Sequence, residues 1–164
     1  MKKISFIALI ICTFLLAANR SQAQDYKTAV GAKFGGFENG FSVKYFMDDR
    51  TALEGILGIR SHGAVLTGLY EVHQQAFNTA GLKFYYGFGA HLGSVGAGRY
   101  KTFGGDDKYY TGNHILLGAD GVLGLEYKIA DAPIAVSLDL NPRVELATGP
   151  FFDLAPGLGL KYTF

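Results

Sequence analysis

The sequence contains no tryptophan, only four prolines and a single cysteine, Cys12, among its 164 residues. One cysteine excludes an intramolecular disulfide and a cysteine-based metal site. The net charge of +1 gives no electrostatic case for binding nucleic acid. The 23 glycines show no G-X-Y period, which excludes a collagen-like chain, and the 49% of hydrophobic residues excludes a disordered one. The length is that of one domain.

No hydrophobic run reaches the roughly 20 residues that a transmembrane helix needs. The longest extends from Ile4 to Ala18, between a basic start with Lys2 and Lys3 and the small-residue site Ser21–Ala23. This is the pattern of a secretory signal. We therefore predict a cleaved signal peptide over residues 1–23 and a mature domain over residues 24–164, with a retained membrane anchor as the alternative. Cleavage removes Cys12 and leaves 12 basic against 14 acidic side chains.

From residue 24 onward, apolar and polar residues alternate with period two, which is typical of β-strands. In Gly81–Gly93, for example, Leu82 and Phe84 share one face while Lys83 and Tyr85 share the other. The segments predicted as strands are Thr28–Gly35, Phe41–Phe46, Thr51–Arg60, Ala64–His73, Gly81–Gly93, Ile115–Lys128, Ile134–Leu146 and Phe152–Phe164. We therefore predict an all-β fold, an eight-stranded antiparallel up-and-down barrel.

The glycines indicate which face of these strands lies inside the barrel. An eight-stranded barrel is just wide enough inside for side chains, so its lumen needs small residues beside large ones. The glycines on the polar face are Gly31, Gly58, Gly87, Gly89, Gly118, Gly124, Gly157 and Gly159. We therefore expect the polar face to line the lumen and the apolar face to lie outside.

Aromatic residues on the apolar face indicate what surrounds the barrel. They are Tyr45, Tyr70, Phe84, Tyr127, Tyr162 and Phe164. With both chain ends on one side, we expect all of them at one level near that rim. Such a belt is typical of amphipathic rings at a membrane interface, so we predict a transmembrane barrel.

The chain ends in an alternating strand, Leu160 to Phe164, with an aromatic last residue. Together with the segment GLKFYYGFGAHLG at Gly81–Gly93, this end resembles the small outer-membrane β-barrel family of the OmpA/OmpX type. The resemblance implies a location in the outer membrane, surrounded by its lipid. It also implies that Tyr162 and Phe164 form a signal for the barrel-assembly machinery.

Two prolines depart from this pattern, because Pro142 and Pro156 fall inside predicted strands of a closed barrel that has no free edge. If the last hairpin turns around Gly149, the two prolines lie opposite each other near the outer rim. We predict that strand pairing loosens there, at a bulge.

The polar face carries equal numbers of basic and acidic residues, seven of each sign. Because buried charges are tolerated when they are paired, we predict a network of ion pairs along the lumen, with Asp139 and Lys161 as one pair. Such a lumen conducts little. The residues are Lys33, Lys44, Glu54, Arg60, Glu71, Lys83, Asp120, Glu126, Lys128, Asp139, Arg143, Glu145, Asp153 and Lys161.

One connection, Gly93–Asn113, is much longer than the others. An even strand number after an N-terminal signal places both chain ends in the periplasm and this loop outside. Long loops often carry function, so it is a candidate site for an extracellular ligand, with a solvated hairpin extension as the plainer interpretation. Its candidate residues are Arg99, Tyr100, Asp106, Asp107, Tyr109 and Tyr110.

The sequence gives only weak signals for a metal site, a catalytic site or a phosphate loop. The four histidines, at positions 62, 73, 91 and 114, lack zinc-ligand spacing and are interpreted as solvated rather than metal-bound. His91 falls on the face assigned to the lumen, where a packed polar group is the plainer interpretation. Ser61 with His62, and His91 with Ser94, are local serine–histidine pairings without a surrounding motif. The glycines at 87 and 89 lack the strand-then-helix context of a phosphate loop.

We therefore expect a structural or loop-presenting outer-membrane barrel that is not an enzyme and has no cofactor or metal. Two alternatives remain open: a lipid-modifying enzyme of the outer membrane, similar to a lipid A deacylase, and a soluble periplasmic carrier similar to a lipocalin.

Overall fold

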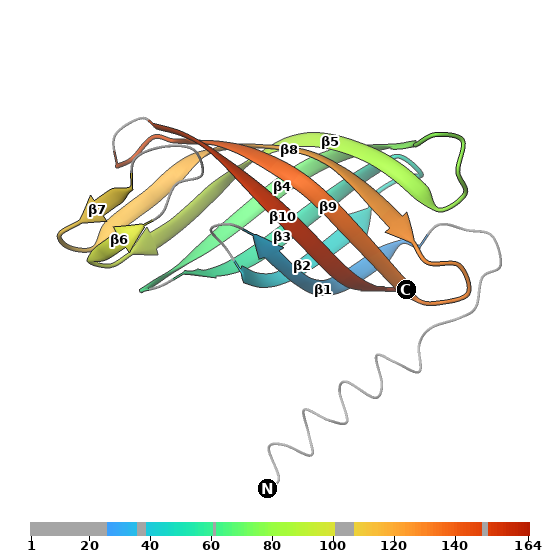
Figure 1. Ribbon diagram of the computed structural model, residues 1–164, viewed down its shortest axis with the longest axis horizontal. Coiled ribbons are helices and arrows are strands. Elements are labelled where there is room, and N and C mark those ends of the chain that lie inside the picture. Colours follow the sequence, from blue (N-terminus) through green and yellow to red (C-terminus); the bar gives the residue numbers. More distant parts are fainter. Residues whose placement is uncertain (1–25, 36–38, 61, 101–106, 149–150) are drawn as a thin grey trace, which may run out of the picture.

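The computed structural model describes residues 26–35, 39–60, 62–100, 107–148 and 151–164. Within them, eight antiparallel strands close into a barrel in the order β1-β10-β9-β8-β5-β4-β3-β2 (Figure 1). The predicted up-and-down barrel is confirmed. No helix in this part of the chain is long and apolar enough to cross a membrane. The barrel strands are β1 (Thr28–Gly35), β2 (Asn39–Phe46), β3 (Thr51–Arg60), β4 (Gly63–Gln75), β5 (Leu82–Val95), β8 (His114–Lys128), β9 (Ile134–Glu145) and β10 (Phe151–Thr163).

The long connection between β5 and β8 holds two further strands that the periodicity did not predict. β6 (Gly98–Tyr100) and β7 (Lys108–Tyr110) form a separate two-stranded sheet. Three residues are too few for an alternating pattern to be recognised in the sequence. In Figure 1 this hairpin lies at one end of the barrel, here called the hairpin end. The C-terminus and the start of β1 lie at the opposite end, here called the terminal end (Figure 1).

Side chains alternate between a buried inner face and an exposed outer face along each strand. On β3, Glu54 and Ile56 are buried, whereas Leu53 and Leu57 are exposed. The exposed side chains are large and apolar: Phe41 is 67% exposed and Phe88 69%. The polar face therefore lines the lumen, as the glycines predicted.

The inner glycines make room for large polar side chains. A Cβ on Gly124 would lie 2.6 Å from Cζ of Tyr85, and one on Gly118 would lie 2.6 Å from Cε1 of His91. The outward-facing Gly68, in contrast, has nothing within 4 Å of the position of a Cβ. At these inner positions, the missing Cβ therefore makes room for the polar side chains of the lumen.

Most of the aromatic belt lies near the terminal end. Tyr45 pairs with Thr28 at the start of β1, and Tyr162 and Phe164 contact each other edge-on at 4.9 Å. Tyr70 is the exception, because it pairs with Phe88 in the middle of β5 and so lies farther from this end than predicted. Tyr70 and Phe88 contact each other at 5.6 Å, so the belt extends toward the middle of the barrel at this point.

The prolines do not face each other. Pro142 pairs with Leu154 and Pro156 with Leu140, and the register between β9 and β10 is continuous. Between β8 and β9, pairing is interrupted opposite Pro142, yet the pairs on either side keep one register, so the predicted loosening occurs without a bulge. Pro142 lies against the outward-facing Gly121, where a Cβ would lie 2.8 Å from Cγ of the proline.

Pro156 lies just beyond the described pairs of β1. Within the described residues, the ladder between β1 and β10 ends at the pair Gly35 and Gly157, one residue before Pro156. No described residue of β1 pairs with Pro156, so the missing N–H of the proline removes no hydrogen bond from the described ladder.

Candidate functional site

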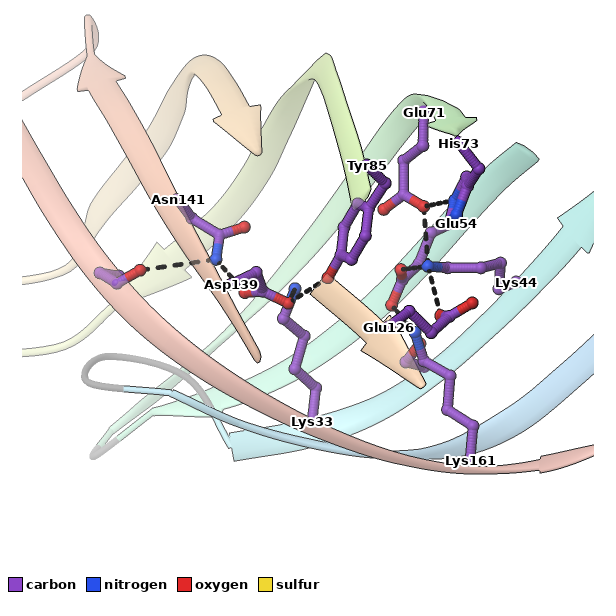
Figure 2. Close-up of polar contacts among 12 residues, drawn as sticks. Lys33, Lys44, Glu54, Glu71, His73, Tyr85, Glu126, Asp139, Asn141 and Lys161 are labelled. Atoms are coloured by element: carbon purple, nitrogen blue, oxygen red, sulfur yellow. Dashed lines mark hydrogen bonds and ion pairs between the residues drawn. The ribbon is translucent and has the colours of Figure 1, made fainter. Parts of the chain in front are cut away.

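The lumen near the terminal end is organised around Lys44 of β2 (Figure 2). Its Nζ lies 3.2 Å from Glu54 of β3, 2.8 Å from Glu71 of β4 and 3.0 Å from Glu126 of β8. All four side chains are at most 2% exposed. Each acid comes from a different strand, so this single ammonium joins opposite sides of the barrel wall.

Each of these acids makes a further polar contact beside the one with Lys44. Lys161 of β10 lies 2.8 Å from Glu54, which also accepts a hydrogen bond from the Ser42 hydroxyl at 2.5 Å. His73 Nε2 lies 3.0 Å from Glu71, and the Tyr26 hydroxyl donates to Glu126. A buried charge cluster is stable only when its members are paired and hydrogen-bonded in this way.

Tyr85 connects this cluster to Asp139 in the middle of the lumen (Figure 2). The Lys44 ammonium lies 4.4 Å from the centre of the Tyr85 ring, whose hydroxyl donates to Asp139 at 2.6 Å. Asp139 also pairs with Lys33 at 3.1 Å and accepts from Asn141 at 2.5 Å.

The specific pair predicted between Asp139 and Lys161 was wrong. Asp139 lies opposite Gly157 on β10, whereas Lys161 lies opposite Ala135 on β9, so the two are at different heights in the lumen. Lys161 instead pairs with Glu54 of β3, which is separated from β10 in the wall by the two strands β1 and β2.

A second charged cluster lies toward the hairpin end. His91 is held between Asp120, at 2.7 Å from Nδ1, and Glu145, at 3.0 Å from Nε2. Arg143 Nε donates to the other oxygen of Asp120 at 2.6 Å, and its NH2 group lies 3.4 Å from the Thr67 hydroxyl. The buried apolar residues Ile56, Leu69 and Val122 pack with Tyr85 in the lumen.

The structure places most of the predicted lumen charges in these clusters. The members of ion pairs are Lys33, Lys44, Glu54, Glu71, Asp120, Glu126, Asp139, Arg143, Glu145 and Lys161. Asp153 is buried on the inner face, and Arg60 and Lys83 are half-buried there. Lys128 differs, because its Nζ donates to the carbonyls of Ile129 and Ala132 in the turn after β8 rather than to an acid.

Several participants were not predicted from the sequence. His73 and His91 are each 1% exposed, so interpreting His73 as solvated was wrong, whereas the placement of His91 as a packed polar group in the lumen is confirmed. Tyr26, Ser42 and Tyr85 were not assigned to the network either. Alternation alone placed His91 and Tyr85 on the inner face, but neither carries a formal charge that would have marked it. In the described part of the chain, no group of three His, Cys, Asp or Glu side chains is arranged to hold a metal ion.

The β6–β7 hairpin turns two of its tyrosines toward the barrel. Tyr100 and Tyr110 pack against the buried cluster of Val65, Val95 and Leu116. The hydroxyl of the first donates to the carbonyl of residue 96 at 2.9 Å. These two predicted partner residues are therefore structural contacts of the barrel mouth.

The neighbouring hairpin residues are more exposed. The Tyr109 side chain is 70% exposed, and Arg99, which is paired with Asp107, is 60% exposed. Asp106 lies outside the described residues. Any surface that this hairpin offers to a partner is therefore centred on Arg99 and Tyr109.

The serine–histidine pairings are not formed by the described side chains. Ser94 is exposed on the outer face of β5, whereas His91 is buried on the inner face. His62 is exposed, and Ser61 lies outside the described residues.

The barrel is similar to a known structure. It matches the crystal structure of the N-terminal β-barrel domain of Pseudomonas aeruginosa OprF with a TM-score of 0.65 and 19% sequence identity, over 86% of this chain and 100% of that one. This match shows a similar fold. The expected resemblance to OmpA/OmpX-type barrels is therefore confirmed for the fold alone. No protein-family model and no curated protein sequence matches the chain.

Proposed function

We propose that the protein is an integral barrel of the outer membrane whose lumen is closed by its own side chains, and that it acts as a structural, loop-presenting protein rather than as an enzyme or a pore. The observation that carries this proposal is the distribution of side chains between the two faces. Soluble proteins rarely expose large continuous apolar surfaces. Here large apolar side chains are exposed on all eight barrel strands, while the described ion pairs between barrel strands lie inside.

The same distribution disfavours a soluble lipocalin-like carrier. Such a carrier needs a polar exterior and a hollow apolar interior, whereas this lumen contains Lys44, Glu54 and Glu126 in direct contact. The alternative of a lipid-modifying enzyme depended in part on His91 and Ser94 acting as a pair. Their side chains face opposite sides of the barrel wall, so this pair is not formed.

The topology follows from the same proposal. The terminal end, with its aromatic belt, faces the periplasm, and the hairpin end faces outside. The signal over residues 1–23 directs export, and the barrel-assembly machinery recognises the last strand with Tyr162 and Phe164. The exposed residues Arg99 and Tyr109 then face a ligand outside the cell.

Two measurements on membrane fractions test this proposal. A folded outer-membrane barrel migrates differently on gels before and after heating, and it stays in the membrane during carbonate extraction. Release by carbonate, or identical migration of heated and unheated samples, would contradict the membrane location. A tag inserted near residue 105 should be cleaved by protease on intact cells, whereas one in the turn after β4 should be protected; the reverse result would invert the topology.

A further inference from the structure

His91 of β5 contacts a carboxylate through each of its two ring nitrogens. Nδ1 lies 2.7 Å from Oδ2 of Asp120 on β8, and Nε2 lies 3.0 Å from Oε2 of Glu145 on β9. All three side chains are at most 2% exposed. An ionised carboxylate only accepts hydrogen bonds, whereas a neutral imidazole has one donor and one acceptor. The two contacts therefore require either two protons on the ring or one on an acid.

The other partners of the two acids indicate that both acids are ionised. Oδ1 of Asp120 accepts from Arg143 Nε at 2.6 Å. Oε1 of Glu145 accepts from the backbone N–H groups of Leu117 at 2.9 Å and Ala147 at 3.1 Å. Hydrogen bonds from a guanidinium and from backbone N–H groups favour the charged form of a carboxylate. The histidine, which the formal charge of the sequence counts as neutral, therefore carries both protons and donates to both acids.

The proton state of this ring acts first on the two acids in contact with it. In the wall itself, His91 lies between Thr67 of β4 and Gly118 of β8, and neither carries a charge. The other described charged side chains of the inner face toward the hairpin end are Arg60 of β3, Arg143 of β9 and Asp153 of β10.

His73 is equally buried but has no such requirement. Its Nε2 lies 3.0 Å from Glu71, and its Nδ1 has no hydrogen-bond partner among the described residues. One proton on Nε2 satisfies this arrangement. The need for a doubly protonated ring is thus specific to His91, and His73 provides a natural control.

Glu145 fastens the hairpin end of the barrel. It is the last residue of β9, and its hydrogen bonds with Leu117 and Ala147 join β8 to the turn after β9. The next residue in that turn, Thr148, shares a hydrogen bond of 3.2 Å with the Tyr110 hydroxyl of β7. A path of hydrogen bonds therefore leads from the histidine ring in the lumen to the β6–β7 hairpin.

We propose that His91 is a pH-sensitive latch of the barrel mouth. While the ring carries both protons, it holds Glu145, and through it the turn after β9 and the β6–β7 hairpin, against the barrel. When the ring loses one proton, the other stays on Nδ1 beside Asp120, which Arg143 keeps ionised. Nε2 then faces Oε2 of Glu145 as one acceptor faces another, so the carboxylate turns away and the hairpin is released. The latch opens as the pH rises and closes as it falls.

The number of protons on the ring is the first measurement. Nitrogen-15 shifts of labelled histidines report it directly, in the barrel reconstituted in lipid nanodiscs. The exposed His62 provides the reference for a solvated ring. At a pH where His62 has become neutral, we expect two protonated ring nitrogens in His91 and one in His73. A neutral His91 ring at that pH would overturn the proposal.

Glu145→Gln is the decisive variant, because its amide keeps every contact without a charge. The amide oxygen accepts from the backbone N–H groups, and the amide NH2 donates to Nε2 of a neutral ring. We therefore expect His91 in this variant to carry one proton, on Nδ1, at the same pH. His73→Gln, which changes the other buried histidine, should leave both protons on His91.

Tryptic cleavage after Arg99 or Lys108 measures release of the hairpin. Rates are divided by that of a free peptide of residues 98–110, which corrects for the pH dependence of trypsin. In the unchanged protein, this relative rate should rise at least about tenfold once the ring loses a proton, as for the loss of one hydrogen bond between charged groups. Glu145→Gln should stay protected at every pH, whereas His91→Phe, which has no ring donor, should be cleaved rapidly at every pH. If His91→Phe does not fold, Glu145→Gln alone decides.

The remaining outcomes overturn the inference. Cleavage that stays constant while the ring loses its proton means that His91 only packs in the lumen. Two ring protons that persist at the highest pH at which the barrel stays folded mean that the ring is a permanent charge and not a switch. A rise in cleavage with pH that Glu145→Gln retains means that another group controls the hairpin.

Discussion

Lys44 contacts acids from three strands at once, so its removal should be far more damaging than removal of an exposed lysine. Lys44→Met removes the ammonium that all three acids contact, so Glu54, Glu71 and Glu126 remain close together with less positive charge near them. We expect a loss of about 3–5 kcal/mol in the free energy of unfolding, the usual effect of breaking a buried pair from one side. Urea titration in vesicles, followed by circular dichroism, measures it.

The exposed Lys27, whose Nζ lies 5.6 Å from the centre of the Tyr45 ring, provides the control. Lys27→Met should change stability little, and Lys161→Met, which removes the ion pair with Glu54, should fall between the two. Equal effects of all three variants would show that the lumen charges do not stabilise the barrel.

Two glycines of opposite orientation test how tightly the lumen is packed. A Cβ at Gly124 would lie 2.6 Å from Tyr85 and 2.7 Å from Asp139, so Gly124→Ala should destabilise the barrel by about 1–3 kcal/mol. Gly68→Ala adds its methyl group outside, where nothing lies within 4 Å, and should be neutral or slightly stabilising. The same urea titration compares them, and a reversed order would mean that the two faces have been assigned wrongly.

At the residue scale, the sequence was sufficient to assign faces but not contact partners. Strict alternation put Lys44 and Glu126 on the inner face, yet their contact joins β2 to β8, which are not neighbours in the wall. Such contacts depend on the width of the barrel and on side-chain conformations across it. Neither is encoded in the period of the pattern.

At the scale of elements, we expect that Tyr110, and not the adjacent Tyr109, holds the β6–β7 hairpin against the barrel. Tyr110 packs against the apolar cluster at the barrel mouth, whereas Tyr109 is 70% exposed. Tyr110→Ala should speed tryptic cleavage after Arg99 or Lys108 in the folded barrel, because the hairpin loses its contact. The Tyr109→Ala variant should be cleaved at the same rate as the unchanged protein. Equal cleavage rates for both variants would contradict the packing role of Tyr110.

The last strand should be required for assembly. Leu160 is 51% exposed on the outer face, so Leu160→Asp puts a charge against lipid, at a cost that depends on depth and is smaller for acids than for Lys or Arg. Deletion of Phe164 removes the aromatic end that pairs with Thr28. Both changes should lower the amount of heat-modifiable barrel in membranes, whereas Met47→Asp in the turn after β2 should not. Normal amounts of both variants would count against the membrane location.

Strand ends were less predictable than strand identity. The bounds of β1 and β3 agree with the predicted Thr28–Gly35 and Thr51–Arg60, because glycine and polar residues follow them. The two prolines were expected to lie opposite each other because the last hairpin was assumed to turn around Gly149. The structure pairs Pro142 with Leu154 and Pro156 with Leu140, and this offset between neighbouring strands cannot be obtained from their separate patterns.

For the whole molecule, the barrel was predictable because one physical requirement acts on every strand. A narrow lumen needs small residues, and a membrane needs apolar ones, so the two faces differ in glycine as well as in polarity. The contacts across the lumen, such as that between Lys44 and Glu126, depend on how all eight strands are paired, which the separate patterns do not give.

The remaining whole-molecule prediction concerns conduction. Eight strands enclose a space that side chains fill, whereas water-filled channels occur in barrels of 16 to 18 strands. Here the Lys44 cluster, the side chains around Tyr85 and the His91 cluster follow one another along the lumen, and Tyr100 and Tyr110 pack at its mouth. The purified monomer in a planar bilayer should therefore show no steady, porin-like conductance, with a 16-stranded porin in the same bilayer as the positive control. Raising the salt concentration should not open it, because buried pairs are screened much less than exposed ones. A large conductance that persists in single-channel recordings would mean that the ion pairs separate in the membrane and would overturn the closed-lumen proposal.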